Sequence, residues 1–401
     1  MGTSLRPQRS SVWVRGPLWD SAWILNALWL LPIALWLAHG YPDTQSSPLD
    51  SFYFGLTALF WIGHRLSSTW LAYCTEAYRP LLRSDPIRFV MLPLLVTLAC
   101  FVVFLPADAA LPWTREERLV AMAVLDYALV TYHFAAQHFG ALSLYRMRAK
   151  RAGSQHARYF DRIFALSVGG GLAFLADILA GSVAYQNLWI GRLDVPTWLT
   201  SNQAAIRAAG LSVLFLATAL MLIAEARAPN FSLPRILYIL GLAAMVAIAL
   251  RPRSFALYLV IWTSQHWVLA TGLASQTTAG EPSPARGAIR RALHALNTRP
   301  WAFLLLFAAA SVLLLPFFEV EANLDNGGTY YSDRIFGAFS GALRTSDWVP
   351  ALVALGFATG FVHYLLDRSV YRMSDPRIRS AARSLLEQRH AVTAAATASR
   401  A

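Results

Sequence analysis

Residues 300–318 read PWAFLLLFAAASVLLLPFF and contain no charged side chain. A membrane-spanning α-helix needs about 20 consecutive, mainly apolar residues, and this segment has that length and composition. Similar apolar runs recur at 18–38, 51–74, 87–106, 117–144, 162–183, 204–225, 233–250, 254–275 and 348–371. The sequence therefore predicts an all-α fold, a polytopic transmembrane helical bundle of about ten spans.

The composition agrees with this class. Of 401 residues, 56% are hydrophobic and 14% are charged, whereas a soluble domain has about 25% charged residues. The net charge of +12 is spread over the loops between apolar runs, so we expect the lipid bilayer, and no nucleic acid, as a partner. Cys74 and Cys100 form no CxxC motif, which argues against a disulfide scaffold, covalent c-type haem and thiolate-bound zinc.

The loops indicate an orientation. Segments 75–86, 145–161, 276–299 and 372–401 are rich in arginine, whereas 39–50 and 319–347 carry most of the loop acids. Because cytoplasmic loops are enriched in Lys and Arg, we expect both termini in the cytoplasm of a multi-pass protein of the bacterial inner membrane. Exceptions to this bias are Arg115, Arg118, Arg251 and Arg253. The first apolar run is long enough to span and is interpreted as a retained helix rather than a signal peptide.

The same pattern divides the chain. Residues 1–275 hold the first eight expected helices, and 276–299, with its Gly and Pro residues, is the expected cytoplasmic linker. Residues 300–371 hold the last two helices, joined by the extracytoplasmic loop 319–347 with a predicted turn at Asn326-Gly327-Gly328. Residues 372–401 form the expected cytoplasmic tail, frayed after Arg383.

Histidines inside these apolar runs are the most informative residues for function. They come from four expected spans and lie between the mid-membrane and the cytoplasmic end: His64, His133, His138, His266 and His363. Ionisable side chains inside a bilayer cost several kcal/mol unless they are paired, hydrated or metal-bound. Neutral imidazole is the commonest side-chain metal ligand, so these five histidines are the predicted metal ligands.

The fourth span carries two of them in YHFAAQHFG, residues 132–140. Asp126, Val130, His133 and Gln137 share one face of a helix, whereas His138 lies about 140° around the axis from His133. Both histidines can therefore flank a site, but they are not expected to chelate one ion in the way that two histidines one helical turn apart do. Either they serve two metals or one of them supports the other ligands; the alternative is a plain hydrogen bond to a neighbouring helix.

The last span ends in HYLLDR, residues 363–368, where His363 and Asp367 lie one turn apart. Asp367 is therefore a predicted metal ligand and the predicted catalytic carboxylate, or it orients a ligating histidine. The alternative is an interfacial pair between Asp367 and Arg368. The predicted ligand set lacks thiolates. Histidines with one carboxylate suit iron, copper or zinc, and of these metals iron is suited to oxygen activation. The expected cofactor is one or two iron ions, with dioxygen as co-substrate.

Two motifs carry a resemblance. The segments YHFAAQHFGALSLYR (132–146) and HYLLDRSVYR (363–372) look like elements of a group of bacterial multi-span membrane proteins with intramembrane histidines. More loosely, the histidine-bearing helices are similar to those of the Brp/Blh-type membrane carotene oxygenases. In that family, histidines from several helices hold an iron ion, and β-carotene is cleaved to retinal with dioxygen. The resemblance implies a histidine-iron membrane oxygenase, without implying carotene as the substrate.

Three functions follow as expectations. The first is a non-haem iron oxygenase that acts on a hydrophobic small molecule and takes electrons from a donor. The second is a haem-binding electron-transfer protein with axial histidines on two helices. The third is a proton- or metal-coupled transporter, against which the missing internal repeat counts. The repeated HxxHH boxes of membrane desaturases are absent from the sequence, which argues against that class.

Overall fold

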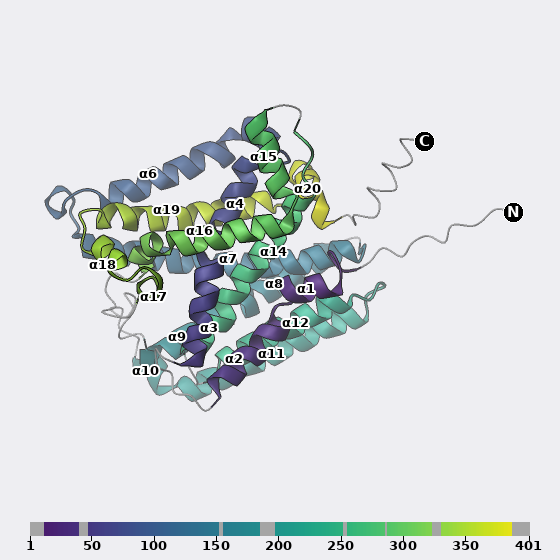
Figure 1. The fold of residues 1–401 in the computed structure, drawn as a ribbon. Coiled ribbons are helices and arrows are strands. Elements are labelled where there is room, and N and C mark those ends of the chain that lie inside the picture. Colours follow the sequence, from purple (N-terminus) through teal and green to yellow (C-terminus); the bar gives the residue numbers. More distant parts are fainter. Residues whose placement is uncertain are drawn as a thin grey trace.

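The computed structural model describes residues 12–39, 47–151, 155–184, 197–251, 255–284, 287–322 and 330–386. Every regular element in these ranges is helical, which confirms the all-α prediction (Figure 1). Six helical segments are long and apolar enough to cross a membrane: Ile87–Phe104, Arg115–Arg148, Gln155–Leu179, Gln203–Ala226, Pro300–Val320 and Val349–Val370. A seventh is added if the bent pair Pro17–Trp23 and Ala27–Ala38 forms one span.

The first half of the chain contains α1 (Pro17–Trp23), α2 (Ala27–Ala38), α3 (Pro48–Leu56), η1 (Thr57–Trp61), α4 (Ile62–Cys74), α5 (Arg79–Ser84), η2 (Ile87–Met91), α6 (Leu92–Phe104), η3 (Asp108–Ala110), α7 (Arg115–Arg148), α8 (Gln155–Leu166), η4 (Ser167–Leu172) and α9 (Ala173–Ala184). The second half contains α10 (Thr197–Ser201), α11 (Gln203–Ala226), α12 (Leu233–Ala249), α13 (Phe255–Leu259), η7 (Val260–Ser264), α14 (Gln265–Ala279), α15 (Ala288–Asn297), α16 (Pro300–Ala322), α17 (Asp333–Phe336), α18 (Ala338–Arg344), α19 (Val349–Val370), α20 (Pro376–Ala381) and η8 (Arg383–Leu385).

The remaining expected spans are helical but fall short of the same criteria. The helix α12, which covers 233–250, is a shorter apolar helix. The runs expected at 51–74 and 254–275 become α3–η1–α4 and α13–η7–α14, and each carries a polar stretch around a histidine. The structure therefore supports a helical membrane protein with six or seven clearly apolar spanning segments.

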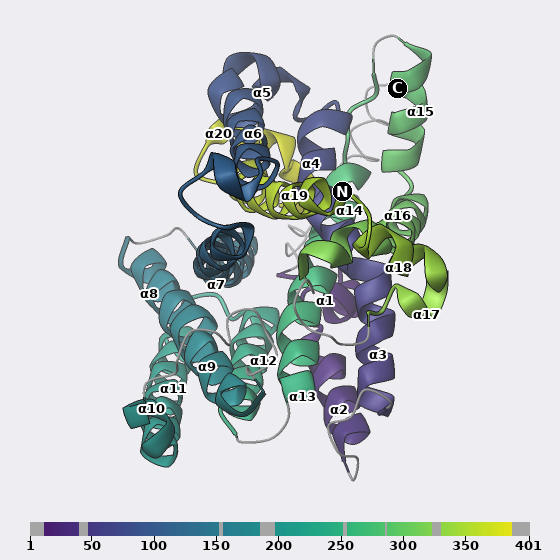
Figure 2. The ribbon, with the colours of Figure 1, turned by 90° about the vertical axis from the view of Figure 1, so that its left-hand side faces the viewer.

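Helix α14 lies at the centre of the bundle. Each of its residues from Gln265 to Thr278 is buried, although many of them are polar. It packs against α1, α4 and α16. The longest helix, α7, begins at a capping box in which Thr114 and Glu117 bond each other's backbone N–H groups. Figure 2 shows α7 nearly end-on, between a group with α4, α6 and α19 and a group with α8, α11 and α12.

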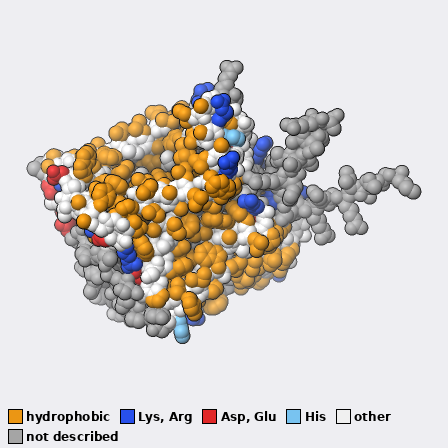
Figure 3. Space-filling view, in the orientation of Figure 1, with side chains coloured by type: hydrophobic (Ala, Val, Ile, Leu, Met, Phe, Trp, Pro, Cys, Tyr) orange, Lys and Arg blue, Asp and Glu red, His pale blue; other side chains and the backbone are white. Residues whose placement is uncertain are grey.

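The outer surface fits a lipid environment. Large apolar side chains on α6 and α11, such as Leu94, Val102, Phe215 and Leu216, are exposed. Figure 3 shows hydrophobic side chains over the middle of this face and Lys and Arg gathered towards one end. An apolar surface of this kind is expected where the surrounding solvent is lipid.

Both described ends of the chain meet at one end of the bundle. Arg148, near the end of α7, donates to the backbone oxygen of Trp13 at 2.9 Å and to that of Leu386 at 2.5 Å. Close by on the helices, Arg235 bridges Asp161 and Glu225 at 2.5 Å, so α8, α11 and α12 are joined by buried ion pairs. The two described ends of the chain therefore lie on the same side of the molecule.

The segments expected to be loops contain short helices. The linker 276–299 includes the end of α14 and all of α15, and the loop 319–347 includes the end of α16, α17 and α18. The expected tail holds α20. These helices are short or carry polar residues, so they do not form the long apolar runs that predict membrane spans. The predicted turn at 326–328 and the tail beyond 386 lie outside the described residues.

Candidate metal centre

Four helices bring four histidines into one buried cluster. His64 comes from α4, His133 from α7, His266 from α14 and His363 from α19, and all four are buried. The ring centroids of His133 and His266 are 4.7 Å apart, those of His64 and His363 are 4.8 Å apart, and those of His133 and His363 are 4.9 Å apart. We call these four residues the four-histidine cluster.

The spacing of the nitrogen atoms fits a metal ion. One ring nitrogen from each of His64, His266 and His363 lies within 4.8 Å of the other two. Nε2 of His133 lies 3.1 Å from Nε2 of His266. Metal–nitrogen bonds of about 2.0–2.1 Å place neighbouring ligand atoms about 3.0–3.4 Å apart. The two Nε2 atoms therefore stand at the separation expected along one edge of a coordination polyhedron.

The opposite ring nitrogens are held by the protein. Nδ1 of His64 donates to the carbonyl oxygen of Trp61. Nδ1 of His266 lies 2.5 Å from Oε1 of Gln137, and Nδ1 of His363 lies 3.0 Å from Oγ of Ser68. Metal-bound histidines almost always use their second nitrogen in this way, because the bond fixes the tautomer and the ring orientation. All three histidines are left with Nε2 as the available ligand atom.

One of these Nε2 atoms lacks a partner. Nε2 of His363 is buried and makes no hydrogen bond within the part of the chain that the structure describes. A buried polar atom without a partner costs about 1–3 kcal/mol. An ion at the centre of the four-histidine cluster would remove this cost, so the donor set and its geometry fit a bound metal.

Two irregular helical segments position the cluster. The π-helical segment η1 ends at Trp61, just before His64 in α4, and the π-helical segment η7 ends at Ser264, just before His266 in α14. A π-helical turn adds a residue to the regular helix and changes the direction in which the following side chains point; such turns are frequent at functional sites. Here they precede two of the four histidines.

Aromatic side chains form the wall of the cluster. The ring of Trp267 stacks on His64 with centroids 5.9 Å apart, and Phe134 lies against His266 at 4.2 Å. Tyr364 lies against His133 at 4.9 Å, and its hydroxyl group donates to Asp126 at 3.0 Å. These rings separate the imidazoles from water, which strengthens electrostatic interactions inside the site.

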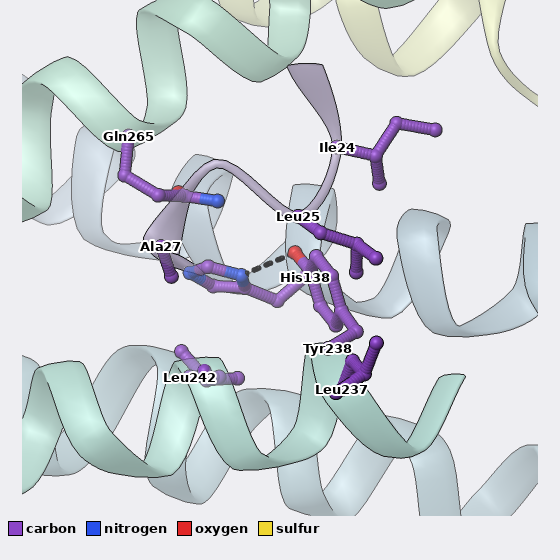
Figure 4. Close-up of a pocket in the computed structure, with 9 residues that line it drawn as sticks. Ile24, Leu25, Ala27, His138, Leu237, Tyr238, Leu242 and Gln265 are labelled. Carbon is purple, nitrogen blue, oxygen red and sulfur yellow. Dashed lines mark hydrogen bonds between the residues drawn. The ribbon is translucent and has the colours of Figure 1, made fainter. Parts of the chain in front are cut away.

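His138 lies apart from the cluster. Its Nδ1 is 2.7 Å from the hydroxyl oxygen of Tyr238, and the two residues line a small cavity together with Gln265 and apolar residues of α2, α12 and the segment between α1 and α2 (Figure 4). Gly169 in η4 makes room for the ring, because a Cβ atom there would stand 2.7 Å from Cδ2 of His138. The two histidines of α7 therefore point to different surroundings, in keeping with their angular separation.

Asp367 is buried, with 8% of its surface exposed, but the structure shows no bond from it to the cluster. Its Oδ1 makes no hydrogen bond to any described residue, and His363 uses Ser68 instead. Arg368 donates to the hydroxyl oxygen of Tyr132 at 2.9 Å. Of the six predicted ligands, the structure brings four histidines together, whereas His138 bonds Tyr238 and Asp367 makes no bond to the cluster.

Some of the residues that hydrogen-bond the histidines could be predicted from the sequence, and others could not. Gln137 shares a helix face with His133, and Ser68 follows His64 by one turn, so helical periodicity places both near the site. Tyr238 belongs to an apolar run without any polar pattern and is found from the structure alone. Comparisons with known proteins find no matching family model, no matching curated protein and no matching solved structure.

Proposed function

We propose that this chain is an integral membrane metalloenzyme that holds one iron ion on the Nε2 atoms of the four-histidine cluster. The observation that carries the proposal is the orientation of the imidazoles. Three of them have Nδ1 bonded to Trp61, Gln137 or Ser68, which leaves Nε2 as the ligand atom, and one ring nitrogen from each of these three lies within 4.8 Å of the other two. Helix-to-helix packing alone does not require this shared orientation.

Oxygen-dependent chemistry on a hydrophobic small molecule is the reaction class that this site supports best. Four neutral nitrogen ligands without a thiolate suit iron that keeps open positions, and such iron supplies dioxygen activation when bound. The residues of the chain hold the imidazoles in one tautomer and keep water out with Trp267, Phe134 and Tyr364. A substrate that dissolves in the bilayer reaches a buried site of this kind from the lipid. Because His138 bonds Tyr238 and Asp367 makes no bond to the cluster, we propose one ion rather than two.

The proposal includes the arrangement in the membrane. We place the protein in a bacterial inner membrane with about ten spans and both termini in the cytoplasm. The lysine and arginine bias of the loops supports this orientation, and the bonds from Arg148 to Trp13 and Leu386 support an even number of crossings.

Two alternatives use the same histidines. A haem held between His133 and His266 requires a macrocycle between their rings, and Nε2 atoms 3.1 Å apart leave no room for one. A metal-coupled transporter would release the ion to either side of the membrane. Uptake of ferrous or zinc ions into proteoliposomes discriminates between transport and catalysis.

The first test is the metal content of the detergent-purified protein, measured by elemental mass spectrometry with an optical spectrum on the same sample. We expect about one iron per chain and no Soret band. His363→Ala and His133→Ala should lose the metal while still inserting in the membrane, and His138→Ala is the matched control that should keep it. A Soret band would favour the haem alternative. Absence of stoichiometric metal after reconstitution with ferrous iron would refute the proposal.

A further inference from the structure

Three aromatic residues connect the four-histidine cluster to one end of the bundle. Trp267 of α14 stacks on His64 with ring centroids 5.9 Å apart and an interplanar angle of 29°. Tyr53 of α3 stacks on Trp267 at 6.1 Å and 21°. Tyr331, just before α17, meets Tyr53 edge-on at 5.9 Å. We call Trp267, Tyr53 and Tyr331 the aromatic chain.

Tyr331, the last member of the aromatic chain, is held by hydrogen bonds to charged residues. Its hydroxyl group donates to Oδ1 of Asp50 at 2.9 Å, and Asp50 also pairs with Arg334 at 2.6 Å. The backbone N–H of Tyr331 donates to Glu319 at 2.6 Å. Tyr331 is partly exposed. A tyrosine at the surface with a carboxylate on its hydroxyl group has a ready acceptor for its proton.

From this arrangement we infer that the aromatic chain carries single electrons between the four-histidine cluster and the surface. The inference rests on the proposed function, because iron held by the four-histidine cluster would supply the oxidising centre in the presence of dioxygen or peroxide. Tyrosine and tryptophan are the aromatic side chains most easily oxidised by one electron, and rings in contact allow short transfer steps. The aromatic chain ends at Tyr331, where an external one-electron donor would reach the protein.

The step balances at Tyr331. One electron passes from its phenol ring through Tyr53 and Trp267 to the oxidised site, which is reduced by one electron. The phenolic proton moves to the carboxylate of Asp50, so a neutral tyrosyl radical remains. A soluble one-electron reductant of the ascorbate class returns the electron, and Asp50 returns the proton.

A second aromatic route leads from the cluster in another direction and is less suited to this role. It begins with Phe134, which lies 4.2 Å from His266, and continues to Trp262 at 5.8 Å and then to His138 and Tyr238. Phenylalanine is far harder to oxidise than tryptophan or tyrosine. The first step of this route is therefore unfavourable, whereas Trp267 touches His64 directly.

The test is freeze-quench electron paramagnetic resonance on iron-loaded protein in detergent, mixed with hydrogen peroxide. The wild type should give a radical signal that narrows when ring-deuterated tyrosine is incorporated. Tyr331→Phe should remove this tyrosyl signal, and Trp267→Phe should lower the yield of the signal per bound iron. Tyr330→Phe is the matched control, since Tyr330 is the neighbouring tyrosine and lies outside the aromatic chain, under the guanidinium group of Arg344. It should leave the signal intact.

The outcomes separate the two proposals. Iron bound without any protein radical overturns the aromatic chain and leaves the proposed function standing. A full tyrosyl signal in Tyr331→Phe, or its loss in Tyr238→Phe or in Tyr364→Phe instead, also overturns the inference, because Tyr364 lies against His133 and donates to Asp126. Absence of iron from the wild-type protein overturns both.

Discussion

At the scale of single residues, the unusual feature of the four-histidine cluster is that its buried Nε2 atoms do not all find hydrogen-bond partners within the cluster. A hydrogen bond between the Nε2 atoms of His133 and His266, 3.1 Å apart, satisfies that pair. It leaves Nε2 of His363 without a partner among the described residues. Buried polar atoms in proteins are nearly always bonded, and the exceptions call for an explanation. A shared metal ion provides one for all the Nε2 atoms at once.

Gln137 should matter for metal affinity although it is not a ligand. Its Oε1 lies 2.5 Å from Nδ1 of His266 and selects the tautomer that presents Nε2 to the centre. Replacing such a partner costs about 10–100-fold in metal affinity. We expect this loss for Gln137→Leu, measured by competition with a chelator. Gln137→Glu keeps an acceptor oxygen and should restore most of the affinity; equal affinity in all three proteins would contradict the role assigned to Gln137.

Asp367 should be dispensable for metal binding. Its Oδ1 is buried and makes no hydrogen bond to the described residues, and His363 bonds Ser68. Asp367→Asn removes a potential buried charge, which is costly when unpaired. We expect unchanged iron content and an equal or higher midpoint of thermal unfolding. A loss of iron as large as that of His363→Ala would return Asp367 to the ligand set.

At the scale of elements, the π-helical segments determine which way the histidines face. Removing one residue from η1 (Thr57–Trp61), for example the exposed Leu59, should restore a regular helix and rotate α3 relative to α4 by about 100°. We expect the protein to lose its metal, as measured by elemental mass spectrometry.

The matched control is a deletion in another π-helical segment. Val90 is an exposed residue of η2 (Ile87–Met91), which precedes α6 and carries no cluster histidine. Its deletion should lower thermal stability while the metal content of the folded fraction is kept. Metal loss in both variants would show that any helical distortion disturbs the site.

The helix α15 is held to the end of α4 by an ion pair outside the membrane. Arg290 donates to Glu76 at 2.6 Å. This bond is the main reason why the pKa of Glu76 lies below its ordinary value of 4.5. A lowered carboxyl pKa stabilises the folded state above the unfolded pKa, and this contribution is lost as pH falls through the folded pKa. Glu76→Gln should therefore unfold earlier than the wild type at pH 7, and the difference should vanish well below pH 4.5. A constant difference would argue against the pair.

The sequence predicts the helices better than their irregularities. Long apolar runs such as 300–318 give α16 and its neighbours because a lipid environment demands apolar side chains and internally satisfied backbone groups. The π-helical segments η1 and η7 have no comparable signature, since residues such as Thr57 and Thr263 are compatible with a regular helix. The histidines were visible in the sequence, but their grouping depends on these local rotations. Tyr238 could not be assigned to His138 in advance, because the periodicity of single helices does not show that α7 and α12 become neighbours.

At the scale of the whole molecule, the cluster joins segments that are far apart in the chain. His64 and His363 belong to α4 and α19, and Ser68 of α4 bonds His363 directly. Sequence periodicity describes one helix at a time and does not determine which helices become neighbours. The expected linker 276–299 divides the chain between α14 and α16, yet α16 packs against both α4 and α14. The cluster therefore draws histidines from both sides of that boundary.

The arrangement in the membrane makes a final prediction. Ile289 in α15 is 78% exposed and Trp348 before α19 is 70% exposed, and α16 lies between them in the chain. If α16 crosses the bilayer, Ile289→Cys and Trp348→Cys must lie on opposite sides. In a background without Cys74 and Cys100, a membrane-impermeant maleimide should label Trp348→Cys in intact spheroplasts and Ile289→Cys in inside-out vesicles. A permeant maleimide should label both in either preparation. Labelling of both positions from one side by the impermeant reagent would mean that α16 does not cross, and the reverse pattern would invert the orientation derived from the arginine-rich loops.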